Sequence, residues 1–169
     1  MTWEAVSALA TLFTGIVILA TVVVGLVQLG ELRRATQLEG VMAVADMFGE
    51  AEFLEGLRFV RHEFEDRLKN DVQFHDEFFS ASLTSGFHPE HRVLMVFELV
   101  GAYIKHGLVN GDAIFDLAAL RILRAWERLG PAVAAVREVS SNWLAWENAE
   151  FLAGQASKWR ERHAPKSTA

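Results

Sequence analysis

The stretch that decides the fold is AVSALATLFTGIVILATVVVGLVQLG, Ala5–Gly30, which has no charged side chain in 26 residues. An α-helix rises about 1.5 Å per residue, so as a helix this stretch exceeds the roughly 30 Å hydrocarbon core of a bilayer. It is longer than the apolar centre of a cleaved signal peptide, and Met1–Glu4 lacks the basic residues of such signals. Residues 1–30 are therefore predicted to form a retained transmembrane helix.

The charges beside this segment predict its orientation. Arg33 and Arg34 follow it closely, and every other Lys and Arg lies C-terminal to them. Basic residues stay on the cytoplasmic side of a membrane, so we expect a protein of the plasma (inner) membrane with its N-terminus outside. Trp3 is expected in the outer headgroup zone, where indole rings concentrate. The lipid bilayer is thus the first expected partner.

Polar and small side chains share one face of the predicted membrane helix. They recur at alternating spacings of four and three residues, which is a heptad seam. The seam consists of Ser7, Thr11, Thr14, Ile18, Thr21, Gly25 and Gln28. Such a face gains more from close packing against another helix than from contact with lipid tails. We therefore expect a homo-oligomer. Two arrangements are open: a closed packing interface, and a ring that turns the threonines and Gln28 toward a wet pore.

The rest of the chain carries helical patterning. An apolar stripe from Leu38 to Phe48 predicts a helical stalk over 31–49 that continues the membrane helix and ends at Gly49. Residues 50–163 are predicted to form a cytoplasmic helical domain, with helix boundaries at Asn70-Asp71, Pro89, Asn110-Gly111 and Gly130-Pro131. Its first helix is expected to reach about Lys69, and its last helix to begin at about Trp143. Residues 164–169 are expected to be a disordered tail. The fold class is all-α.

Composition narrows the possible chemistry. The chain has no cysteine, which excludes disulfides, thiolate zinc sites and thiol nucleophiles. Its net charge of −6 argues against a general nucleic-acid surface, so no nucleic-acid partner is expected. Arg121, Arg124 and Arg128 fall on one helical face. This stripe is either solvated or contacts acidic partners or the anionic inner leaflet.

Two charged residues predict a buried polar network. Glu98 is the interior charge of the segment Val93–Ile104, which is apolar nearly all round, so its carboxylate must be paired or protonated. Arg137 lies on a short apolar segment and is the expected partner. A structural role is favoured over a catalytic one, because removing one member of such a pair is costly.

Several short motifs carry a family resemblance. They are Leu32-Arg33-Arg34 with Thr36, Phe97-Glu98, Gly107-Leu108-Val109, Trp126-Glu127 with Leu129 and Pro131, Arg137, Trp146-Glu147, and Glu150-Phe151-Leu152. Together they resemble a family of small bacterial single-pass membrane proteins catalogued only as a domain of unknown function. The resemblance implies a membrane helix with an all-helical cytoplasmic domain, and no activity, cofactor or catalytic residue. The layout alone is similar to that of CRISPR-associated membrane proteins that assemble into pores.

The histidines allow weaker hypotheses. His88 and His91, with His75 upstream, could be metal ligands, but no third ligand is fixed by spacing. Small helical nucleases place four to six residues between an arginine and a histidine, whereas three residues separate Arg58 from His62 and two separate Arg160 from His163. We therefore expect no metal, no cofactor and no catalytic residue.

Function follows from these expectations as three alternatives. The favoured one is a membrane-anchored, self-assembling helical protein that forms an oligomeric pore or effector. The second is a membrane-tethered scaffold with a partner-binding helical domain. The third is a membrane-tethered ribonuclease.

Overall fold

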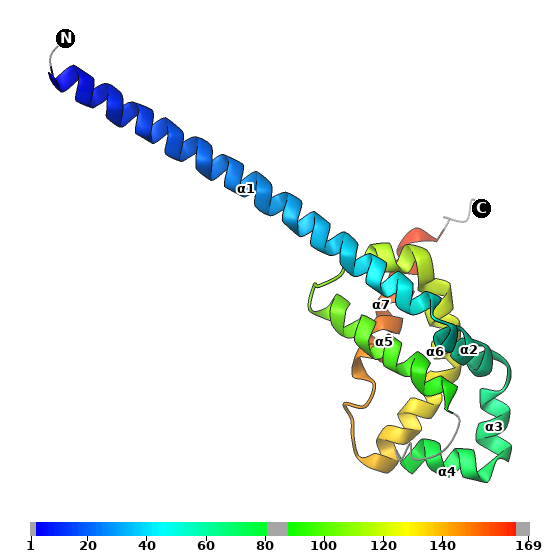
Figure 1. Ribbon diagram of the computed structural model, residues 1–169. Helices are drawn as coiled ribbons and strands as arrows, with labels where there is room; N and C mark the ends of the chain where they lie inside the picture. The colour runs from blue at the N-terminus through cyan, green and yellow to red at the C-terminus, as the bar shows by residue number, and fades with distance from the viewer. Residues whose placement is uncertain (1–2, 81–87, 165–169) are drawn as a thin grey trace. The chain divides into compact units, whose positions relative to one another are not determined.

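The computed structural model describes residues 3–80 and 88–164 (Figure 1). These residues form helices and contain no strand, which confirms the all-α fold class. The helices are α1 (Trp3–Gly49), α2 (Ala51–His62), α3 (Phe64–Asn70), α4 (Val72–Ser80), α5 (Pro89–Lys105), α6 (Gly111–Ser140) and α7 (Glu147–His163). The expected tail at 164–169 lies outside the described residues apart from Ala164.

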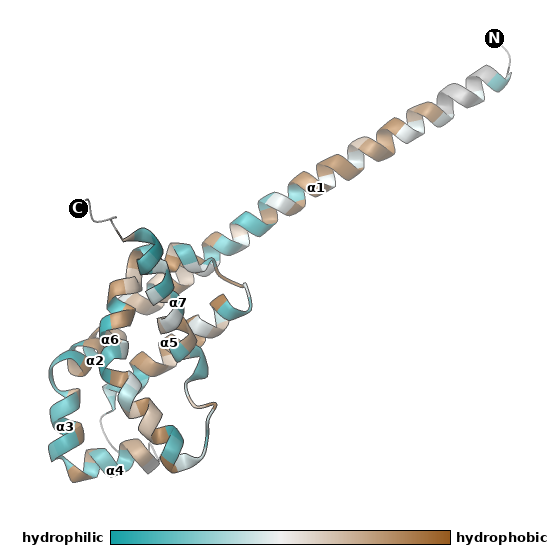
Figure 2. Ribbon diagram, turned by 180° about the vertical axis from the view of Figure 1, so that it is seen from behind, coloured by the Kyte–Doolittle hydropathy of each residue, from teal (hydrophilic) through white to brown (hydrophobic). Residues whose placement is uncertain are grey.

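Helix α1 is continuous over 47 residues. The predicted continuation of the apolar segment through 31–49, and its end at Gly49, are both confirmed. From Thr11 onward the helix is long and apolar enough to cross a membrane, with a mean hydropathy of 2.5 in its most apolar window. Figure 2 shows the apolar residues of α1 in brown.

The chain divides into two units, residues 1–39 and 40–169. The second unit includes the end of α1, where Val44 and Phe48 are buried in its core. A Cβ added at Gly40 would lie only 2.9 Å from the Val109 side chain. The helical unit therefore begins at Gly40, inside the segment expected as a stalk, because the apolar stripe of that segment packs into the core.

Helix α5 is the central element of the second unit. It packs against α2 and α7, and α6 packs against both of these as well. The face of α5 that carries Val93, Leu94 and Phe97 is fully buried. Met95 and Leu99 on its other side are 49% and 40% exposed. The segment predicted to be buried nearly all round is thus buried on one broad face.

Helix α6 corrects the boundary predicted at Gly130-Pro131. It runs through Pro131 without ending and spans 30 residues. Proline removes one backbone donor and frees the carbonyl four residues earlier, which belongs to Glu127. Pro131 and Glu127 are exposed, so water can satisfy that carbonyl. The buried stripe continues from Leu129 to Val133, and its packing outweighs the local preference for a break.

Two other predicted boundaries differ. The helix expected to reach Lys69 is interrupted at Glu63, where Phe64 turns inward to contact Phe59 and Phe74 in an aromatic cluster. The last helix begins at Glu147 instead of Trp143. In both cases contacts between distant segments move the helix boundary, and these contacts cannot be predicted from the local sequence pattern.

Two glycines set how closely the helices approach. A Cβ at Gly101 of α5 would lie 1.9 Å from the Asn148 carbonyl oxygen in α7, and a Cβ at Gly56 of α2 would lie 2.4 Å from the Pro89 carbonyl oxygen in α5. Neither backbone can yield easily, since each belongs to a packed helix. Contacts of α5 with both neighbours therefore require glycine at these positions.

Gly101→Ala is expected to destabilise the second unit by about 2–3 kcal/mol or more, because overpacking forces the backbones apart. Gly154→Ala in α7 is the matched control, since a Cβ there meets no atom within 4 Å. Alanine at this helical position should be neutral or stabilise by up to about 1 kcal/mol. Urea unfolding of the full chain in mild detergent, followed by tryptophan fluorescence, measures both. Equal effects of the two variants would contradict the close approach.

Candidate functional site

The first candidate site is the apolar surface of α1. The side chains of 11–30 are exposed except at Gly25, which is partly covered. Leu12 is 64% exposed, Phe13 69% and Leu19 67%. None of the most apolar window of α1 is buried by the described chain. An uncovered apolar surface of this extent makes α1 a candidate for contact with lipid or with other protein.

The seam residues lie on this exposed helix, and two of them use their hydroxyl groups internally. Thr11 Oγ1 donates to the Ser7 carbonyl at 3.0 Å, and Thr21 Oγ1 donates to the Val17 carbonyl at 2.8 Å. With its proton already bonded, each hydroxyl can leave water at a reduced cost. Contacts between copies along the seam would then depend on close packing more than on new hydrogen bonds.

The expected interfacial residues are also exposed. Trp3 is 85% exposed at the start of α1. Arg33 and Arg34 are exposed, and Arg34 Nη1 lies 3.3 Å from Glu31 Oε1. Glu31 therefore offsets part of the positive charge that follows the apolar segment.

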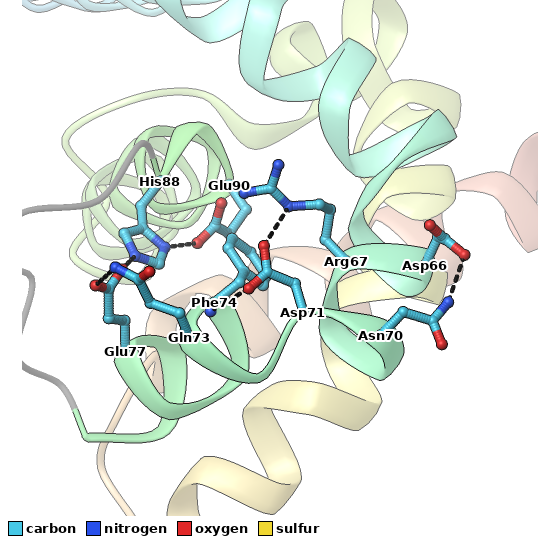
Figure 3. Close-up of polar contacts among 9 residues, drawn as sticks. All are labelled: Asp66, Arg67, Asn70, Asp71, Gln73, Phe74, Glu77, His88 and Glu90. Carbon is cyan, nitrogen blue, oxygen red and sulfur yellow. Dashed lines mark hydrogen bonds and ion pairs between the residues drawn. The ribbon is translucent and has the colours of Figure 1, made fainter.

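A buried polar cluster joins α4 to the start of α5 (Figure 3). His88 Nδ1 lies 2.7 Å from Glu90 Oε1, and His88 Nε2 lies 2.9 Å from Glu77 Oε2. The side chains of His88 and Glu90 are only 5% and 1% exposed. The imidazole also stacks on the Phe74 ring, with 5.0 Å between ring centres. Both ring nitrogens are thus committed to carboxylates inside the fold.

The electrostatics of this cluster favour retention of a proton. Burial lowers the pKa of His88, but hydrogen bonds and charge attraction from Glu77 and Glu90 outweigh it, so its pKa is raised. Burial raises the pKa of Glu90 against the opposing hydrogen bond from His88. Hydrogen bonds from Gln73 and then His88 lower the pKa of Glu77. These shifts favour a charged His88 beside an ionised Glu77, whereas burial opposes the charge of Glu90.

The neighbouring corner between α3 and α4 is fixed by further polar contacts. Asp71 accepts a hydrogen bond from the Phe74 backbone at 3.0 Å, which caps the start of α4. Arg67 pairs with Asp71 at 3.2 Å, and its guanidinium lies 5.5 Å from the centre of the Phe74 ring. Asn70 bonds Asp66 at 2.7 Å (Figure 3). These contacts hold α4 in the position from which Glu77 reaches His88.

Sequence reasoning missed the burial of Glu90, although a signal for it exists. Val93, Leu94 and Phe97 follow Glu90 at three, four and seven positions and are all buried. Residues at this spacing share one helix face, so the pattern places Glu90 on the buried face of α5. Glu98 is only partly buried.

The expected ion pair between Glu98 and Arg137 is wrong. Glu98 accepts hydrogen bonds from the Asn148 side chain at 2.7 Å and from the Ala149 backbone at 2.9 Å. These donors lie in the first turn of α7, where free N–H groups and the helix dipole favour a carboxylate. The first turn of α7 therefore satisfies the charge of Glu98 without an arginine.

Arg137 also contacts the start of α7. Its Nε donates to the Ala145 carbonyl at 2.8 Å, and its Nη1 lies 2.7 Å from Glu150 Oε2. Glu98 from α5 and Arg137 from α6 thus both hold the start of α7. The start of α7 thus takes the place of a direct contact between them.

The remaining candidates are dispersed. His91 meets the Trp146 ring edge-on, with 5.2 Å between ring centres, and does not join His88. Over 3–80 and 88–164, no three or more His, Asp or Glu side chains form a group that could hold a metal ion. Arg58 and His62 are exposed on α2. His163 stacks on Trp159 with 4.3 Å between ring centres, and Arg160 beside it is exposed.

His88→Gln is expected to destabilise the chain more at about pH 6 than at about pH 8. Because the pKa of His88 is raised by folding, the native state binds a proton that the unfolded state holds less tightly. This contribution is complete below the unfolded pKa of about 6.5 and is lost as the pH rises through the folded value. Loss of charge-assisted hydrogen bonds should cost about 2 kcal/mol at the lower pH. Urea unfolding at both pH values measures the difference.

The titration of His91 has the opposite effect on stability, and comparison of each variant with the native chain at the same pH removes most of it. Burial, followed by repulsion from His88, lowers the pKa of His91, which favours the folded state at higher pH. His106→Gln is the control, because His106 is exposed and its side chain has no hydrogen bond within the described parts of the chain. An equal loss from His88→Gln at both pH values would contradict the protonated cluster.

A family model described as "Domain of unknown function (DUF4760)" matches residues 15–159. Its range takes in much of the apolar part of α1 and the helices up to α7, which agrees with the resemblance found from the motifs. No curated protein and no solved structure shows a significant match. Since the match covers most of the chain, this protein belongs to the family of the domain of unknown function DUF4760.

Proposed function

We propose that this protein is a membrane-anchored helical protein that self-assembles through α1. The observation that carries the proposal is the apolar surface of 11–30, which no described part of the chain covers. A water-exposed helix with this surface would be costly, at about 25 cal/mol for each Å² of apolar area. In lipid the same helix satisfies all its backbone groups internally.

The flanking charges support an orientation. Arg33 and Arg34 follow the apolar segment, and no Lys or Arg precedes it. Retention of basic residues in the cytoplasm places the N-terminus outside the inner membrane and residues 40–169 inside the cell.

The seam supports self-assembly. Thr14, Thr21 and Gly25 present smaller side chains than the leucines that share α1 with them. Helices in lipid associate where small residues let their backbones approach. The internal hydrogen bonds of Thr11 and Thr21 support a closed interface, because a dry helix contact then needs no further acceptor for these hydroxyl protons.

A groove of about 360 Å³ favours the scaffold as a second candidate function. It is lined by Val44, Phe48, Leu54 and Leu117, and Leu117 is 65% exposed. Apolar side chains in a hollow of this kind suit a protein partner. The state of the chain in mild detergent separates the two candidates: a monomer supports the scaffold, and an oligomer supports self-assembly.

Cysteine crosslinking tests the seam directly, because the native chain has no cysteine. Thr14→Cys and Thr21→Cys are expected to form disulfide-linked dimers rapidly in native membranes. Leu12→Cys and Leu19→Cys are the controls, since they lie away from the seam, and should crosslink several-fold more slowly. Faster crosslinking at the leucine positions would contradict the proposed interface. Ion flux that appears only with the oligomer would replace the closed interface with a pore.

Orientation is tested with the same cysteine-free background. In intact cells, a membrane-impermeant maleimide is expected to label Trp3→Cys and to leave His106→Cys unlabelled. After permeabilisation both exposed positions should react. The reverse pattern would contradict an outside N-terminus, and release of the chain by alkaline carbonate would contradict membrane insertion.

A further inference from the structure

A groove between α2 and α6 gathers four arginines. It has a volume of about 320 Å³, and Arg61 of α2 faces Arg121, Arg124 and Arg128 of α6 across it. Leu57, Val60 and Ala125 supply an apolar part of the lining. Glu127 is the carboxylate that lines the same groove. The groove therefore combines a surplus of positive charge with an apolar wall.

This concentration of charge costs the helix stability. Arg121, Arg124 and Arg128 follow one another at three and four positions, so they are neighbours on one face of α6. Like charges at this spacing destabilise a helix by a few tenths of a kcal/mol for each pair. The chain as a whole carries a net charge of −6, so the cluster is contrary to its general composition.

The protein itself satisfies only part of the cluster. Arg128 Nη1 pairs with Glu65 at 2.7 Å, and Arg121 Nη1 donates to the Phe48 carbonyl at 3.4 Å. Arg61 and Arg124 make no hydrogen bond or ion pair with the residues that the structure describes. Two guanidinium groups, one from each side of the groove, thus remain available to a ligand.

We propose that this groove binds a small ligand that carries one or two phosphate groups. Guanidinium groups bind phosphate oxygens through paired N–H donors, and Arg61 and Arg124 supply two such forks. The volume lies at the lower end of the range for small-molecule sites, which begins at about 300 Å³. Leu57 and Val60 would take the carbon part of the ligand. This inference is independent of self-assembly through α1.

The charges around the groove favour a compact anion. The groove itself has four arginines against Glu127. An adjoining hollow sets Asp116 against Arg61, Arg121 and Arg124, and another sets Glu65 and Asp66 against Arg61, Lys69 and Arg128. The surplus of positive charge is therefore largest in the groove, which favours an anion small enough to stay there.

Calorimetric titration of the full chain in uncharged detergent with pyrophosphate tests the site. Arg61→Gln/Arg124→Gln should weaken binding at least about tenfold, which corresponds to about 1.4 kcal/mol. Arg58→Gln/Arg160→Gln removes the same charge from two exposed arginines outside the groove and should change affinity less than about twofold. Equal thermal unfolding of both variants checks that each is folded.

A conservative variant separates paired recognition from a general electrostatic field. Arg124→Lys keeps the charge but loses the planar fork, so it should weaken pyrophosphate binding measurably. Absence of saturable binding by the native chain at millimolar pyrophosphate would overturn the proposal. A loss of affinity in the control pair as large as that in the groove pair would also overturn it.

Competition against pyrophosphate identifies the source of the phosphate. A short-chain phosphatidylglycerol that displaces pyrophosphate from the native chain would support the site and assign it to a lipid headgroup. Displacement by ATP at a lower concentration would support the site and assign it to a soluble phosphate compound. In either case the variant Arg61→Gln/Arg124→Gln should bind the competitor more weakly, as it does pyrophosphate.

Discussion

The exposed apolar surface of α1 is the constraint on which the proposed biology of this protein depends. A helix satisfies its own backbone hydrogen bonds, so its side chains alone decide whether it belongs in water or in lipid. Between Thr11 and Gly30 no side chain is charged and most are apolar, and the described chain leaves them uncovered. The proposal assigns their burial to a bilayer and to other copies of α1. The proposed anchoring and the proposed assembly therefore both depend on this one surface.

The second unit depends on a different constraint, the close approach of its helices. Gly56 of α2 and Gly101 of α5 let α5 contact the backbones of α2 and α7 closely. At such short separations little room remains for water, and polar groups must find partners within the protein. Glu98 accordingly bonds the first turn of α7, and Glu90 bonds His88. The glycines allow the close packing, and the internal polar pairs satisfy the groups that this packing removes from water.

Charges in this unit fall into two classes. Those near α4, α5 and α7 are matched by local partners, and they fix one helix against another. Those in the groove between α2 and α6 are only partly matched, because Arg128 pairs with Glu65 whereas Arg61 and Arg124 have no ion pair within the described residues. Matched buried charges are costly to break and hold structure in place. Unmatched charges at a groove instead remain available for recognition of an anion.

Features that depend on neighbours along the chain could be predicted from the sequence. Hydropathy and the absence of charge in Ala5–Gly30 identified the long apolar helix, and the apolar stripe to Phe48 predicted its end at Gly49. Pro89 and Asn70-Asp71 marked helix boundaries because they act on the local backbone. The arginine stripe of α6 was visible for the same reason, as a repeat of three and four positions.

Only the tertiary structure decided which residues meet across helices. It placed Arg61 opposite the α6 arginines, gave Glu98 the first turn of α7 in place of Arg137, and buried Glu90 beside His88. It also carried α6 through Pro131, because the packing of Leu129 and Val133 outweighs one lost backbone hydrogen bond. Periodicity along one helix defines its faces, but the partner of each face depends on how distant helices fill space together.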